Sequence, residues 1–494
     1  MLFSSIPFLY YFLPLVLAVY FLTPARFRNA VLLLASLIFY AWGEPKYVLL
    51  MLASILSGYG FGLLQERYRG QKGAKLVCGL SVAVSLSFLL YFKYADFFLE
   101  NFNAATGLGV PLLRIALPIG ISFYTFQIIS YTVDVYRGEP AQKNLIHLAA
   151  YVAMFPQLIA GPIVRYSDIA QQLEHRSHST ALAAEGVRRF LIGLGKKILI
   201  ANQLGELCSV FRASDEKSVL FYWLYAVAFA LHIYFDFSGY SDMAIGLGKL
   251  FGFDFLENFN YPFISKSITE FWRRWHRTLG TWLKDYVFYS ISLSKMNMNL
   301  NRSVKKHMKG NFGRFILSAF PLFFVWFFNG FWHGASWKYI VYGLYYYLIM
   351  MMGLLLAPVF TKIKDTWHLH EQRKGYRLFC ILRTVLIVFG GMLIFRAHSL
   401  DDALQMLLRI FTMQETDILA HGLTLVDFGI LIWGLVLMFI IAGLKERRVN
   451  LFALFDQKSL LLRYGIILII GVSIIVFGIY GHGYQASDFI YGEF

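Results

Sequence analysis

Long apolar runs separated by short polar gaps dominate this chain of 494 residues. A helix that crosses a bilayer needs about 20 mostly apolar residues. Runs close to that length occur near residues 6–22, 29–43, 46–64, 76–94, 115–133, 219–235, 313–331, 338–357, 378–396, 425–444 and 463–481, and a weaker one covers 145–163. The pattern predicts an all-α, polytopic integral membrane protein with about eleven spanning helices.

The same pattern divides one predicted membrane domain, 1–494, into three parts. Residues 1–135 and 311–494 hold ordinary spans with short loops, whereas 136–310 hold short apolar stretches interrupted by Gly, Pro and charge. Irregular backbone at membrane depth is tolerated only where it is buried in protein or lines a cavity. We therefore expect the middle part, and 145–163 above all, to form re-entrant and interfacial elements around a functional cavity.

The net charge of +16 comes from Lys and Arg clustered in gaps between apolar runs. This distribution is the positive-inside pattern of membrane proteins and argues against a nucleic-acid partner. It predicts that the N-terminus and the 397–424 loop lie outside, and that 65–75 and 362–377 lie inside. The first run has no basic residues before it, so we expect an uncleaved span. The three cysteines are far apart in the sequence and predict neither disulfides nor a metal site.

Two segments of the middle part have helical periodicity with polar and apolar faces. Glu185–Leu204 predicts an amphipathic helix in the membrane interface. Thr269–Asp285 predicts a second one, with a tryptophan stripe opposite a basic stripe and His276 at the border between them.

Two histidines beside tryptophans are the candidate chemical groups: His276 in 271–279 and His333 in 330–335. An ionisable group near membrane depth is costly and is a functional candidate by default, and histidine moves protons near neutral pH. The alternative is a hydrogen-bonded residue that snorkels to the interface. Gly334 and Ala335 favour a functional His333, because small residues allow close approach. His232, inside an apolar run, is more typical of a satisfied core residue.

Asp236 and Asp242 lie beside the apolar run 219–235. They are candidates to orient an imidazole, but Ser241 and Asp242 before Met-Ala-Ile are more typical of a helix N-cap. The sequence contains no metal motif, no P-loop and no nucleophile elbow.

Five motifs in order resemble the membrane-bound O-acyltransferases, and within them the branch that acetylates bacterial polysaccharides such as alginate. They are Leu117–Gln127, Phe155–Pro162, Tyr234–Gly246, Thr269–His276 and Trp332–Gly334. The resemblance covers essentially the whole chain. It implies a helical funnel in the bacterial cytoplasmic membrane, acetyl-CoA as donor, a polysaccharide acceptor and an extracytoplasmic partner similar to SGNH hydrolases. Two departures, the basic stretch after Ser290 and Gly492 near the end, leave the polymer open.

On this resemblance the two family histidines correspond to His333, expected to be the general base, and His276, expected to position the thioester or share the proton. Trp275 and Trp332 are expected to support them. A basic group is a candidate for the phosphates of coenzyme A: Arg273, Arg274 and Lys284. Two alternatives remain open, D-alanyl transfer from a carrier protein and a non-catalytic polymer transporter. A transporter is typically built from paired half-repeats, and none is evident here.

Overall fold

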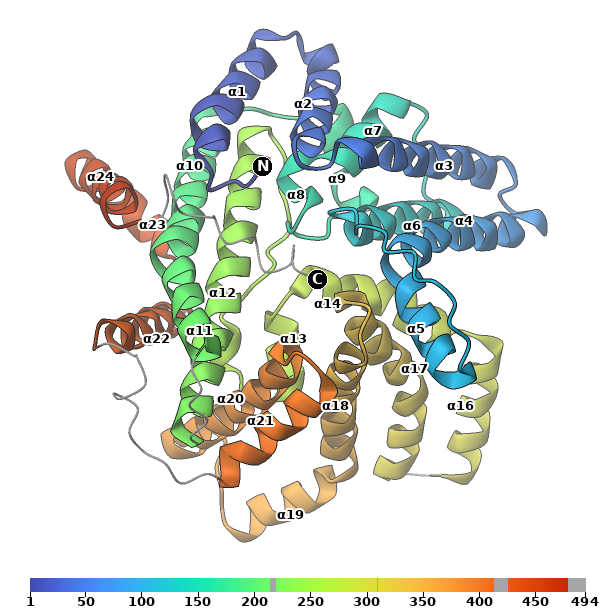
Figure 1. Cartoon of the computed structure of the whole chain (residues 1–494), viewed down its shortest axis with the longest axis vertical. Helices are drawn as coiled ribbons and strands as arrows, with labels where there is room; N and C mark the ends of the chain where they lie inside the picture. The colour runs from blue at the N-terminus through green and yellow to red at the C-terminus, as the bar shows by residue number, and fades with distance from the viewer. Residues whose placement is uncertain (214–218, 309, 413–424, 479–494) are drawn as a thin grey trace. The chain divides into compact units, whose positions relative to one another are not determined.

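The computed structural model describes residues 1–213, 219–308, 310–412 and 425–478, and every regular element within them is a helix (Figure 1). The all-α prediction is confirmed. Two compact units share the chain. Unit 1 comprises Met1–Leu199, Asp236–Glu257 and Ile470–Phe494, and unit 2 comprises Ile200–Phe235 and Asn258–Ile469. Glu415 and Asp417 of the predicted outer loop, and Gly492, lie outside the described residues.

Unit 1 contains most of the N-terminal helices. They are α1 (Leu13–Leu22), α2 (Arg28–Gly43), α3 (Val48–Arg67), α4 (Gly73–Leu89), α5 (Ala95–Thr106), α6 (Ile121–Arg137), α7 (Leu145–Ala153), α8 (Phe155–Leu158), α9 (Tyr166–Glu174) and α10 (Thr180–Gly195). Helices α3, α4 and α6 pack on one another, and α2 packs against α7 (Figure 1). Gly62 allows the close contact of α3 with α6, because a Cβ there would lie 2.4 Å from the Tyr131 hydroxyl.

Unit 2 contains most of the later helices. They are α11 (Asn202–Ala213), α13 (Ile268–Arg274), α14 (Arg277–Trp282), α15 (Tyr289–Ser292), α16 (Lys295–His307), α17 (Gly310–His333), α18 (Trp337–Leu355), α19 (Ala357–Thr366), α20 (Lys374–Arg396), α21 (Leu400–Thr412), α22 (Leu425–Glu446) and α23 (Leu451–Asp456). Helix α18 packs between α17 and α20, and α21 packs on α20 (Figure 1). Helices α12 (Val219–Leu250) and α24 (Leu460–Phe477) each contribute to both units.

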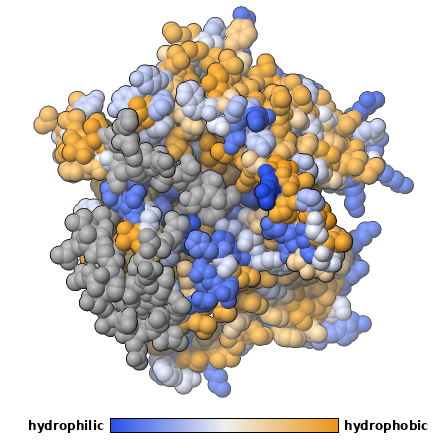
Figure 2. All heavy atoms as spheres, in the orientation of Figure 1, coloured by the Kyte–Doolittle hydropathy of each residue, from blue (hydrophilic) through white to orange (hydrophobic). Residues whose placement is uncertain are grey.

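Within the described residues, six helical segments are long and apolar enough to cross a membrane. They are Pro45–Arg67, Gly73–Thr106, Gly310–His333, Trp337–Leu355, Lys374–Arg396 and Leu460–Phe477. Each coincides with a predicted apolar run. Large apolar side chains also remain exposed, such as Leu461 at 87% and Leu22 at 85%. Figure 2 shows broad hydrophobic areas on the visible face. Such surface suits contact with lipid tails rather than water.

The predicted stretch 145–163 is broken and buried. Helix α7 begins at the Asn144 cap, whose side chain accepts a hydrogen bond from the Ile146 amide at 2.9 Å, and it ends at Ala153. The short α8 follows, and the chain then runs on without a helix to Tyr166. The prediction that this stretch is not a straight, exposed spanning helix is confirmed. The 115–133 run is corrected, because its helix begins only at Ile121, after Gly120 turns the backbone at φ +76°.

Helix α10 and a following π-helical turn, Lys196–Ala201, pack against α12 within unit 1. Glycines make this contact close: a Cβ on Gly193 would lie 2.5 Å from the Gly239 carbonyl oxygen, and one on Gly246 would lie 2.6 Å from the Gly186 carbonyl oxygen. The segment 185–204 was expected to be an amphipathic helix in the membrane interface, and that placement stays a prediction. Three of its basic residues form ion pairs with aspartates of α12: Arg189, Lys196 and Lys197.

Candidate active site

His333 is the last residue of α17, and aromatic rings surround it in unit 2. Its ring centroid lies 5.0 Å from that of Phe395 on α20 and 5.7 Å from that of Tyr342 on α18, both nearly perpendicular to it. Only 5% of His333 is exposed. Three helices therefore hold the imidazole in a narrow, mostly apolar setting.

Glycines bring α17 and α18 together just before His333. A Cβ on Gly330 would lie 2.2 Å from the Tyr339 carbonyl oxygen, and one on Gly343 would lie 2.2 Å from the Trp326 carbonyl oxygen. A Cβ on Gly334 would lie 2.4 Å from the Tyr339 ring. Gly334 was expected to let backbone or a ligand approach closely, but the group that approaches it is the Tyr339 ring.

His276 lies at a break between two short helices, α13 and α14. Its backbone is left-handed, with φ +42° and ψ +53°. The prediction of one amphipathic helix over 269–285 is therefore wrong at its centre. The non-helical segment 258–260 replaces the lost helical hydrogen bonds. The Asn260 amide donates to the Arg274 carbonyl at 2.8 Å, and the Arg277 amide donates to the Asn258 carbonyl at 2.9 Å.

Asn258 also determines the protonation of His276. Its side-chain oxygen lies 2.9 Å from Nδ1 of His276, and it accepts hydrogen bonds from the Thr278 hydroxyl at 2.9 Å and the Thr278 amide at 3.4 Å. Because an amide N–H only donates, the group of Asn258 that faces it is the oxygen. Nδ1 of His276 is then the protonated nitrogen, and Nε2 keeps the lone pair. Burial lowers the pKa of His276 to about 3, so the ring is neutral at ordinary pH.

Trp332 lies close to both histidines. Its ring centroid is 5.7 Å from that of His276 and 4.9 Å from that of His333. Trp275, by contrast, stacks on Phe271 at 5.6 Å and packs edge-on against Phe259 at 5.2 Å. The Trp332 indole thus packs near two imidazoles that are 57 positions apart in sequence (276 and 333). Trp275 instead packs among other aromatic side chains.

Comparison with known proteins assigns the chain to a family. Residues 37–397, which include both histidines, match the membrane-bound O-acyltransferase family. The chain belongs to this family. It is therefore a multi-pass membrane O-acyltransferase, as the five sequence motifs predicted.

The relatives of this O-acyltransferase include enzymes with related names. A probable alginate O-acetylase of Azotobacter vinelandii is 42% identical over 422 residues, which cover 84% of this chain and 79% of that protein. A probable alginate O-acetylase of Pseudomonas aeruginosa is 41% identical over 461 residues, covering 90% and 82%. A peptidoglycan O-acetyltransferase of Helicobacter pylori is 32% identical over 447 residues, covering 82% and 79%.

The three basic residues predicted to attract coenzyme A have different surroundings. Arg274 forms ion pairs with Glu270 and Glu446, both at 2.8 Å, so two carboxylates compensate its charge. Arg273, on the same helix, is exposed. Lys284 is exposed and has only a distant pair, 4.0 Å from Asp285. Two of the three cations are therefore open to an incoming anion.

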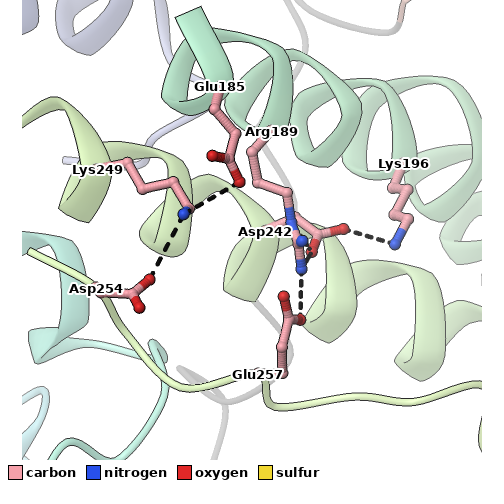
Figure 3. A network of polar contacts seen from close by, with 7 residues as sticks. All are labelled: Glu185, Arg189, Lys196, Asp242, Lys249, Asp254 and Glu257. Carbon is pink, nitrogen blue, oxygen red and sulfur yellow. Dashed lines mark hydrogen bonds and ion pairs between the residues drawn. The ribbon is translucent and has the colours of Figure 1, made fainter. Parts of the chain in front are cut away.

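Asp236 and Asp242 belong to unit 1, within α12. The N-cap interpretation of Asp242 is wrong, because α12 continues through it to Leu250. Its carboxylate binds Arg189 and Lys196, both at 2.6 Å, as Figure 3 shows. Burial would raise the pKa of Asp242, but Lys196 and Arg189 together hold it below its usual value. Asp236 pairs with Lys197 at 2.6 Å and is fully buried.

Two residues of the site were missed by sequence analysis, Asn258 and Asn329. Asn329 lies one turn before His333 on α17 and is 6% exposed. Its side-chain oxygen accepts no hydrogen bond within the described part of the chain. The i, i+4 spacing of Asn329 and His333 was a signal that both face one side of the helix. Nothing in the local sequence indicated that Asn258 meets His276.

Proposed function

We propose that this O-acyltransferase transfers acetyl from acetyl-CoA to a hydroxyl of an extracytoplasmic polysaccharide, directly or through a partner similar to SGNH hydrolases. Support for acetyl as the group comes from the relatives, which are named for O-acetylation of alginate and of peptidoglycan. The observation that carries the proposal is the pair of buried histidines that both lie close to Trp332, one of them neutral at ordinary pH.

His333 is the proposed general base. It takes the proton of the acceptor hydroxyl as the oxygen attacks the thioester carbonyl. The C–O bond forms, the C–S bond breaks, and the imidazolium returns the proton to the departing thiolate. A positioned acid–base group contributes about 10²–10⁴-fold to such a reaction.

His276 is the proposed second group, which positions the thioester or shares the proton. The Asn258 contact supports this role, because Nε2 is the nitrogen left to accept a proton or a hydrogen bond. Trp332 would keep both rings in fixed orientations. Arg273 and Lys284, being exposed, are the proposed contacts for the phosphates of acetyl-CoA, with Arg274 in a structural role.

The proposed setting is one functional domain in the bacterial cytoplasmic membrane. It has about eleven spans with re-entrant and interfacial helices that form a funnel, and its N-terminus is outside. Impermeant thiol labelling in intact cells tests the orientation. A cysteine placed at Lys72 should resist labelling, and one placed at Asp401 should react.

The test of function uses purified full-length protein in nanodiscs with radiolabelled acetyl-CoA and polysaccharide acceptors. His333→Ala should abolish transfer and His276→Ala should reduce it strongly, with insertion and folding unchanged. His232→Ala is the matched control and should mainly affect stability, because His232 packs against Gly205, where a Cβ would lie 3.2 Å from the imidazole. Wild-type turnover by a folded His333→Ala protein would contradict the mechanism.

Two other functions make different predictions in the same assay. A D-alanyltransferase uses a D-alanyl carrier protein in place of acetyl-CoA. A polymer transporter moves the acceptor across the bilayer without forming an ester, and is indifferent to His333→Ala.

A further inference from the structure

Three basic side chains from distant parts of the sequence surround Tyr20 in unit 1. Arg28 comes from α2, and Arg176 and His178 come from the loop after α9. The guanidinium carbons of Arg28 and Arg176 lie 5.4 and 5.9 Å from the Tyr20 ring centroid. The centroid of the His178 ring lies 5.7 Å away. Tyr20 itself is completely buried.

The Tyr20 hydroxyl organises two of these groups. It donates to the Phe251 carbonyl at 3.0 Å, so its oxygen is left to accept. Nε of Arg176 donates to it at 3.2 Å, and Nε2 of His178 lies 3.1 Å away. Nε2 of His178 must therefore be protonated, and its N–H is used by the Tyr20 hydroxyl.

The remaining bonds fix Arg176 without using all of its donors. Nη1 donates to the Asn29 side chain at 2.6 Å and to the Gln172 carbonyl at 3.2 Å. Within the described residues, Nη2 of Arg176 has no hydrogen-bond acceptor. Arg28 bonds only through Nε, to the Thr23 carbonyl at 3.3 Å, so both of its terminal nitrogens have no acceptor in the described chain.

No carboxylate of the described residues forms an ion pair with Arg28 or Arg176. Glu174 is two residues from Arg176 but is not paired with it, and Asp254 pairs with Lys249 at 3.5 Å. Burial lowers the pKa of Arg176, Tyr20 offsets part of this effect, and Arg28 lowers it further. Burial lowers the pKa of His178, and Arg28 and Arg176 add to the shift. The charges of Arg28 and Arg176 are therefore close enough to repel each other.

The loop that carries Arg176 and His178 packs closely against the turn at Gly252. Gly252 has φ +81°, and a Cβ there would lie 3.1 Å from the His178 ring and 3.3 Å from Cβ of Arg176. The Phe253 ring supports the Arg176 guanidinium at 4.5 Å. The two guanidinium groups are thus held beside the same ring with terminal N–H groups that have no acceptor in the described chain.

We propose that Arg28 and Arg176 form a phosphate-binding site beside Tyr20, with His178 helping to hold the Tyr20 hydroxyl in place. Arginine terminal N–H groups suit phosphate oxygens, and the aromatic surroundings strengthen the contact by limiting water. The phosphate belongs either to an anionic phospholipid head group or, if acetyl-CoA is the donor as proposed above, to the nucleotide portion of coenzyme A, in which case Arg28 and Arg176 contact it rather than Arg273 and Lys284. The site does not depend on the acceptor or on His333.

Binding measurements on the full-length protein in phosphatidylcholine nanodiscs test the site. One arm compares coenzyme A with dephospho-coenzyme A, and the other measures retention of phosphatidylglycerol by native mass spectrometry. Arg28→Gln is the main variant, because Arg28 makes a single hydrogen bond and should not hold the fold. This variant should weaken the binding of either coenzyme A or phosphatidylglycerol by about tenfold, the loss in affinity expected for one charge-assisted phosphate contact.

The pattern of losses identifies the source of the phosphate. If Arg28→Gln weakens coenzyme A, the phosphate is the donor's, and an effect absent with dephospho-coenzyme A assigns the 3′-phosphate. If it weakens only phosphatidylglycerol, the ligand is a lipid. Arg176→Lys, which keeps the charge but loses the fork of donors, should weaken the same ligand. Lys72→Gln, an exposed lysine in another basic loop, is the control for net charge. The proposal is overturned if both arginine variants bind both ligands like wild type, or if Lys72→Gln loses as much affinity as Arg28→Gln.

Discussion

The side-chain oxygen of Asn258 lies 2.9 Å from Nδ1 of His276, and this contact sets the chemistry of the imidazole. Asn258 follows α12 by a short connection, whereas His276 interrupts the α13–α14 segment. The same asparagine accepts from Thr278 and gives its backbone carbonyl to the Arg277 amide. One residue therefore fixes the break in the helix, the orientation of the ring and the nitrogen that carries the proton.

Asn258→Ala should lower the acyl-transfer rate without removing the imidazole. Loss of a hydrogen bond to a buried group costs about 1–3 kcal/mol, which corresponds to about 5- to 150-fold in rate if the bond is needed in the transition state. Single-turnover kinetics with labelled donor measures the change. Asn260→Ala is the control, since Asn260 is exposed and uses only its backbone amide in this contact. Equal rates for the two variants would show that His276 needs no orientation.

Gly330→Ala should displace His333 by pushing α17 away from α18. The added methyl would lie 2.2 Å from the Tyr339 carbonyl oxygen, and overpacking of this kind costs about 1–3 kcal/mol. We expect a lower melting temperature in detergent together with a large loss of activity. Gly353→Ala on the same helix pair has open space within 4 Å and should be neutral or slightly stabilising, because alanine favours a helix.

Asn329→Leu should separate stability from activity. The buried side-chain oxygen of Asn329 has no acceptor role within the described chain, and such a group costs about 1–3 kcal/mol. A leucine of similar size removes this cost, so thermal stability should hold or rise. If the oxygen instead accepts a hydrogen bond from the acyl donor or from the hydroxyl substrate beside His333, the variant loses activity. Unchanged kcat and KM would assign Asn329 to packing alone.

Asp242→Asn should destabilise unit 1 strongly. Its buried carboxylate binds both Arg189 and Lys196, and breaking a buried pair costs about 3–5 kcal/mol because charges remain uncompensated. A melting curve in detergent measures the loss. Asp254→Asn removes a similar carboxylate that is 80% exposed and 3.5 Å from Lys249, so it should change stability by less than about 1 kcal/mol. A comparable shift in both variants would contradict the burial argument.

Apolar runs are a local property, so the sequence predicted helices able to cross a membrane; six such segments occur among the described residues, against about eleven expected spans. The six segments able to cross a membrane all coincide with runs such as 313–331 and 378–396. The two histidines could be selected as candidates because each lies in a distinctive Trp-His motif, and the structure brings both rings close to Trp332. Their connection through Trp332 depends on how α17 meets the α13–α14 break, which periodicity does not contain.

The errors share one cause: long-range partners override local pattern. Asp242 resembled an N-cap because Ser241 and Asp242 precede an apolar stretch, yet its partners Arg189 and Lys196 are 53 and 46 positions away. The tryptophan stripe of 269–285 resembled one helix, but Asn258 and Asn260 supply the hydrogen bonds that let the backbone break at His276. Sequence spacing alone does not reveal either contact.

The pH dependence of stability provides a direct test of the His276 environment. His276 lies outside the six candidate spans, and burial lowers its pKa from 6.5 to about 3. Below pH 6.5 the unfolded chain therefore binds a proton that the folded protein excludes. The stability associated with neutral His276 is complete above pH 6.5 and falls by about 1.4 kcal/mol for each pH unit between 6.5 and 3.

His276→Gln removes this titration while keeping a side chain that can meet Asn258. Lowering the pH from 7.5 to 5.5 should therefore cost wild type about 1.4 kcal/mol more than the variant. Melting curves of both proteins in detergent measure that difference, and other titrating groups cancel because they are common to both. Over the same range His276 stays neutral, so an acid limb in the rate of acetyl transfer must come from another group. Parallel melting curves for the two proteins would mean that His276 is hydrated and titrates normally, which would remove the basis for a permanently neutral base beside Trp332.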